Sequence, residues 1–139
     1  MSTAQSILIL GGLVHFLVSM LAAYFLYWER VRRPEKPAQR YGLISHKVSL
    51  WNGFLLFSLA VAIEYTIFTP TVNSLLAAMA LTSTLLSDAS NLRRWMVGME
   101  DQFTQGPEWR IRAIGLVHIL DLVVISGILY GVSRFVLGI

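Results

Sequence analysis

Four long apolar stretches, separated by short polar or charged segments, dominate the chain. A helix needs about 20 apolar residues to cross a bilayer, and each stretch reaches that length. They cover residues 7–28, 46–68, 72–91 and 111–135. The pattern therefore predicts an all-α integral membrane protein, a four-helix bundle in which residues 1–139 form a single transmembrane domain.

Two local features refine this prediction. Pro70 lies between two threonines and no charged residue is near it, which is typical of a tight turn between the second and third stretches. The first stretch is not expected to be a cleavable signal peptide. It lacks a basic segment before it, and its apolar run is too long for one.

The lysines and arginines predict the orientation in the membrane. All but one of the 11 basic residues lie in or beside the two segments 29–46 and 92–111, and only Arg134 lies on the other side. Cytoplasmic loops of membrane proteins carry such an excess of basic residues. We therefore expect a multi-pass protein of the cell (inner) membrane, with both segments cytoplasmic and the N and C termini non-cytoplasmic.

The composition excludes several classes of function. The chain is 55% hydrophobic and only 14% charged, which is too apolar for a soluble domain of 139 residues. It has no cysteine, so disulfides, thiolate metal sites and covalently attached haem are excluded. No phosphate-binding loop or dinucleotide fingerprint is present. The basic residues flank apolar stretches, so no nucleic-acid partner is expected.

Polar side chains inside the apolar stretches are the candidates for chemistry, because they are costly in lipid. They are His15, His46, Asn52, Glu64, Asp88, Asn91, His118 and Asp121. Most fall in the predicted cytoplasmic half, which indicates one polar or cofactor-holding zone. Asp88 and Asn91, like His118 and Asp121, are three residues apart and share a helix face. They predict either a hydrogen-bond network between the last two helices or a metal site or proton relay.

His46 begins the second stretch, and Asn52 and Gly53 follow it. Gly53 is seven residues further on and lies on the same helix face, where a glycine leaves room for a flat macrocycle ligated by the histidine. The alternative is that His46 lies at the membrane interface and Gly53 is a notch for helix packing. Asn52 points about 100° away from Gly53 and needs a hydrogen-bond partner in apolar surroundings.

The segment from Ser45 to Phe54 resembles the start of the second helix in the styrene oxide isomerase family, four-helix membrane enzymes with a His-x5-Asn-Gly motif at this place. The resemblance implies that His46 is the axial ligand of the iron of a haem b bound between subunits of a homotrimer. It also implies that Gly53 belongs to the cofactor site and that Asn52 is catalytic and positions the substrate. The family has a catalytic tyrosine four residues after an asparagine in the third helix, whereas Trp95 follows Asn91 here.

The activity implied by the resemblance is isomerisation of an aryl epoxide. Ferric haem acts as a Lewis acid on the epoxide oxygen, the ring opens towards a carbocation, and a 1,2-hydride shift gives the aldehyde. One alternative is a haem protein for electron transfer or quinone chemistry, with a second iron ligand from His15, His118, Met96 or Met99. Another is a cofactor-free accessory subunit or small transporter whose polar residues serve packing or proton movement.

Overall fold

The computed structural model describes residues 1–101, 105 and 108–139, so part of the predicted loop 92–111 lies outside the described residues. The described part of the chain is all-helical and contains no strand, as predicted. Its elements are α1 (Thr3–Arg32), α2 (Arg40–Ala62), the short 3₁₀ helix η1 (Ile63–Tyr65), α3 (Pro70–Met96) and α5 (Glu108–Leu137).

Three of the described helices, α1, α2 and α5, are long and apolar enough to cross a membrane. Helix α3 has 27 residues but is more polar than the other three. Its polar side chains include Ser83, Thr84 and Asp88, which are buried against neighbouring helices. The membrane character of the fold agrees with the sequence, and a membrane crossing by α3 stays a prediction.

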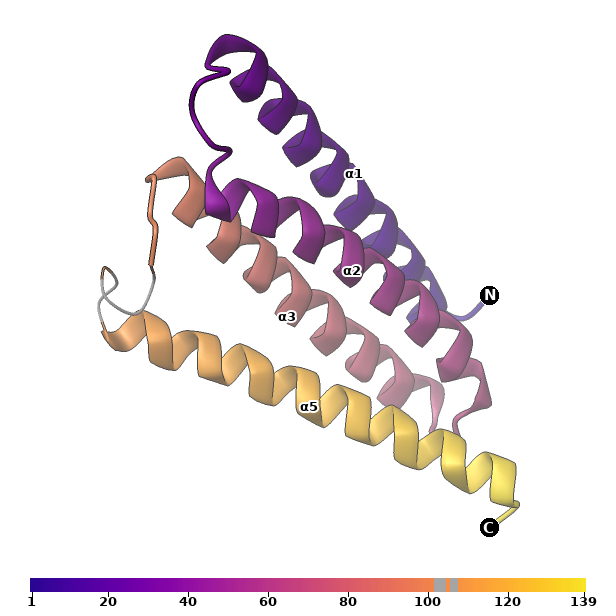
Figure 1. Ribbon diagram of the computed structural model, residues 1–139. Coiled ribbons are helices and arrows are strands. Elements are labelled where there is room, and N and C mark those ends of the chain that lie inside the picture. Colours follow the sequence, from indigo (N-terminus) through magenta and orange to yellow (C-terminus); the bar gives the residue numbers. More distant parts are fainter. Residues whose placement is uncertain (102–104, 106–107) are drawn as a thin grey trace.

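The four long helices lie side by side in chain order (Figure 1). Both chain ends and the α2–α3 turn are at one end of the bundle, and the other two connections are at the opposite end (Figure 1). Helices α1 and α3 end at this opposite end, where α2 and α5 begin. We call it the arginine-rich end. It carries Arg30, Arg32, Arg40, Arg93, Arg94 and Arg112.

The second helix begins and ends six residues earlier in the chain than expected. Helix α2 ends at Ala62 and does not run on to Phe68, because η1 and a short turn follow it. The backbone carbonyl of Ile63 accepts hydrogen bonds from Thr66 Oγ1 at 3.0 Å and from Asn73 Nδ2 at 3.4 Å. These side chains replace the backbone partners that further helix would supply. Pro70 is the first residue of α3, a position where its missing N–H costs nothing.

Helix α5 packs closely along only one of its halves. Val124 and Ile128 are buried in the apolar core together with Leu56 and Ala77. None of the described side chains between Arg112 and Leu120 is buried. Helix α5 therefore diverges from the rest of the bundle towards the arginine-rich end, as Figure 1 shows.

Candidate functional site

A buried hydrogen-bond network joins α1, α2 and α3. Asp88 on α3 accepts a hydrogen bond from His15 Nδ1 at 2.7 Å and another from Asn52 Nδ2 at 3.0 Å. The second ring nitrogen of His15 lies 2.9 Å from the hydroxyl of Thr84. His15 is 0% exposed and Asp88 is 3% exposed. Each carboxylate oxygen and each imidazole nitrogen thus has a partner, as buried polar groups require.

This network supplies the partner that Asn52 was expected to need. The spacing of Asp88 and Asn91 predicted a link between the last two helices, but Asp88 bonds to α1 and α2 instead. Asn91 accepts a hydrogen bond from Arg94 on its own helix at 2.9 Å. A shared helix face fixes the spacing of two side chains but not the neighbour that each meets.

A separate contact links α3 to α5. The hydroxyl of Ser83 donates to the carboxylate of Asp121, whose other oxygen is 3.7 Å from His118 Nδ1. The His118 side chain is 71% exposed. Within residues 1–101, 105 and 108–139, no three histidine, aspartate or glutamate side chains gather as they would to hold a metal ion.

His46 is fixed by Ser19 across the contact between α1 and α2. Its Nδ1 lies 2.9 Å from the Ser19 hydroxyl and 3.0 Å from the Ser19 carbonyl oxygen. Because a carbonyl oxygen can only accept, we assign the proton to Nδ1. The Ser19 hydroxyl donates to the His46 carbonyl oxygen at 3.0 Å. Nε2 has no hydrogen-bond partner in the described part of the chain. In a neutral imidazole, a proton on Nδ1 leaves the lone pair on Nε2. The half-buried ring therefore presents a nitrogen that can ligate a metal.

Gly53 lies at a close contact between α1 and α2. A Cβ atom at Gly53 would meet the Phe16 ring at 2.5 Å and the Gly12 carbonyl oxygen at 3.2 Å. Phe16 thus fills the space beside Gly53, where the sequence led us to expect room for a macrocycle. Any group on His46 Nε2 must then lie outside this contact between the two backbones.

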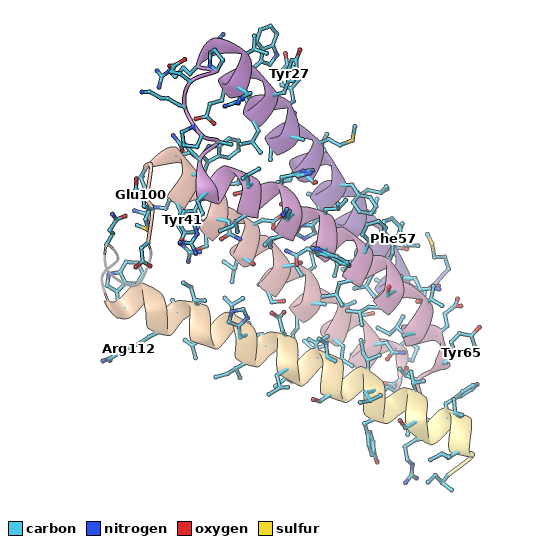
Figure 2. All side chains as sticks on the ribbon, viewed as in Figure 1. Tyr27, Tyr41, Phe57, Tyr65, Glu100 and Arg112 are labelled. Carbon is cyan, nitrogen blue, oxygen red and sulfur yellow. The ribbon has the colours of Figure 1, made fainter. Side chains whose placement is uncertain are left out.

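A cleft of about 730 Å³ lies between α2, α3 and the diverging half of α5. Asn91, Tyr41 and His118 are among its lining residues. Tyr41 and Arg112 both lie at the arginine-rich end of the bundle, whereas Tyr65 lies at the opposite end (Figure 2). Trp95 does not line the cleft, and its indole packs on Gly42, where a Cβ atom would be 2.8 Å from the ring.

Sequence reasoning missed four hydroxyl residues of the site. Ser19 and Thr84 support His46 and His15, and the buried hydroxyls of Ser45 and Ser49 have no hydrogen-bond partner among the described residues. Serine and threonine are common in membrane helices, so their type alone gives no signal. A signal lay in the spacing, because Ser19 and Thr84 are each four residues from a residue already selected, His15 and Asp88.

Comparison with known proteins adds no assignment. No protein-family model matches the chain, and searches of curated proteins and of solved structures found no significant match. The case for a function therefore rests on the geometry of the two histidines and on the sequence motif that contains His46.

Proposed function

We propose that this protein is a membrane haem b protein, with His46 as the axial ligand, and that it isomerises an aryl epoxide to an aldehyde. The observation that supports this most is the arrangement of His46. The Ser19 carbonyl holds the proton on Nδ1, so Nε2 keeps its lone pair outside the α1–α2 contact. Histidine ligands of metals usually have such a partner on the other ring nitrogen.

The position of His46 also fits a haem shared between subunits. The ring is half-buried at the surface of the α1–α2 pair. A haem bound there would rest on the outside of a single chain, so a second copy would be needed to cover it. This agrees with the homotrimer implied by the motif, and the exposed apolar side chains of α1 and α2, such as Met20, Trp51 and Phe54, offer the surface.

The residues of this chain have four tasks in the proposed reaction. His46 binds the iron, Ser19 orients the ring of His46, and the apolar side chains around them exclude water. The haem, when bound, supplies a Lewis acid for the epoxide oxygen. Asn52 remains our candidate for positioning the substrate. Its amide nitrogen is held by Asp88 on a different side of α2 from the Ser19 contact of His46.

We further propose that all four long helices, including α3, cross the cell membrane with the arginine-rich end in the cytoplasm. The 27 residues of α3 would extend about 40 Å at 1.5 Å per residue, which is enough for a bilayer core of about 30 Å. Of the buried polar side chains of α3, Asp88 bonds to His15 of α1, and Thr84 bonds to the Ala80 carbonyl of α3 itself.

The deciding experiment is an absorption spectrum of the detergent-purified, haem-replete protein, oxidised and reduced, with a haemochrome assay. We expect about one b-type haem per chain, a five-coordinate ferric form and turnover of aryl epoxides. His118→Ala is the matched control, because that exposed ring should not affect haem content. A flat visible spectrum, or a His46→Ala variant with unchanged haem, would reject the proposal.

The electron-transfer alternative requires a second iron ligand. His15 is a poor choice, because both of its nitrogens are engaged with Asp88 and Thr84. His118, Met96 and Met99 are then the remaining candidates. A six-coordinate spectrum with a reversible iron couple would favour this alternative over isomerisation.

A further inference from the structure

The cleft between α2, α3 and α5 has the size and shape of a ligand site. Its volume of about 730 Å³ falls within the range usual for small-molecule pockets. It is a wedge, because α5 is packed at Val124 and Ile128 but not along its first half. The first half of α5 begins at the arginine-rich end, so the wide end of the wedge lies there. In a membrane, this end of the helices would lie where the bilayer meets water.

The two ends of the cleft differ in chemistry. Towards the middle of the bundle its walls are mainly aliphatic, with Val48 from α2, Leu86 from α3 and Val117 from α5. Ser87 and His118 add two polar side chains there. At the mouth it is lined by three arginines and one aspartate. These are Arg40, Arg93, Arg94 and Asp101. An apolar slot that ends in an excess of positive charge is complementary to an anionic amphiphile.

Arg94 is the best-placed of these cations. Its guanidinium donates to Asn91 Oδ1 at 2.9 Å and lies 5.4 Å from the centre of the Tyr41 ring. Burial lowers the pKa of Arg94, and the nearby Tyr41 opposes this to a smaller extent. No carboxylate of the described residues forms a salt bridge with it. Arg94 is thus a partly desolvated cation, held in one direction, without an anionic partner among the described residues.

We propose that this cleft binds an anionic phospholipid, with its phosphate at Arg94 and an acyl chain between α5 and the α2–α3 pair. A free phosphate would leave the aliphatic walls uncovered, and a neutral lipid would leave the arginines unpaired. Basic pockets between membrane helices bind anionic lipid head groups in this way. The site is separate from His46, because Val48 projects about 200° around α2 from that histidine.

The test is native mass spectrometry of the protein released from nanodiscs that contain phosphatidylglycerol and phosphatidylcholine in equal amounts. We expect one phosphatidylglycerol per chain to be retained. Arg94→Gln should weaken retention about fivefold, the effect of one arginine near a membrane surface. Arg32→Gln is the matched control, since it removes the same charge at the same end but lies over Trp28, outside the cleft.

A second variant tests the apolar part of the site. Val117→Trp fills the slot without changing charge, and we expect it to displace the acyl chain while circular dichroism shows unchanged helicity. Equal retention of both lipids, or equal loss with Arg32→Gln and Arg94→Gln, would overturn the proposal. So would binding of glycerophosphoglycerol, which lacks acyl chains, as tight as that of the lipid. Loss of haem or of the oligomer in place of lipid would assign the cleft to those occupants.

Discussion

His15 on α1 and His46 on α2 differ in their hydrogen-bond partners, although both are histidines in helices apolar enough to cross a membrane. His15 is fully buried, and both of its ring nitrogens are engaged by α3. His46 is half-buried and has one nitrogen engaged, by α1. A fully satisfied histidine can hold helices together, whereas a histidine with a free lone pair can also bind a ligand.

The difference comes from the neighbours and not from the helices that carry the two rings. Asp88 and Thr84 face His15 from α3, and each engages one of its two ring nitrogens. Among the described residues, His46 forms side-chain hydrogen bonds only with Ser19, whose backbone carbonyl fixes the tautomer. The following predictions test this division of roles.

The largest effect is expected at His46 itself. His46→Ala should abolish haem binding, because it removes the only ligand that we propose for the iron. His15→Ala should retain haem in the fraction that folds. Pyridine haemochrome assays on monodisperse protein measure both, and comparable haem loss in the two variants would contradict the assignment.

Asp88→Ala should destabilise the fold by about 2–6 kcal/mol, because two buried donors lose their acceptor at a cost of about 1–3 kcal/mol each. The change leaves His15 and Asn52 without their shared acceptor. Denaturation in mixed detergent micelles measures the free energy of unfolding. In haem-free protein, His46→Ala should change it by about 1 kcal/mol, since the substitution removes only the hydrogen bonding of the ring to Ser19. The reverse order would show that the two histidines have exchanged roles.

Gly53→Ala should cost about 1–3 kcal/mol of unfolding free energy, because the new methyl group overpacks the contact with Phe16 and Gly12. Gly115→Ala is the matched control. No atom lies within 4 Å of a Cβ at Gly115, so alanine should be neutral or slightly stabilising there. Equal effects at the two glycines would argue against a close approach of α1 and α2.

The smallest effect is expected at Ser19. Ser19→Ala removes the hydroxyl but keeps the carbonyl that accepts from His46 Nδ1. The lost hydroxyl also lies 2.9 Å from His46 Nδ1. Loss of a supporting contact to a metal ligand usually weakens binding 10–100-fold, and we expect about tenfold because the carbonyl is kept. Haem titration measures it. Ser58→Ala is the control, because that hydroxyl bonds only to Phe54 of its own helix, and its haem affinity should not change.

Long apolar runs made the helices predictable from the sequence. The backbone of such a run must satisfy its own hydrogen bonds in lipid, and a helix does so within one segment. The early end of α2 at Ala62 was not predictable in the same way. It depends on Thr66 and Asn73 reaching the Ile63 carbonyl, and apolar residues continue past that point.

The sequence by itself determined which residues are polar in an apolar chain, and hence that His15, His46, Asn52 and Asp88 would matter. Only the tertiary structure decided their partners. Rotation of a helix about its axis by one residue turns each side chain by about 100°, so spacing along one helix cannot say which neighbour a side chain meets. The packing of α1, α2 and α3 brought Asp88 to His15 and left His46 with one free nitrogen.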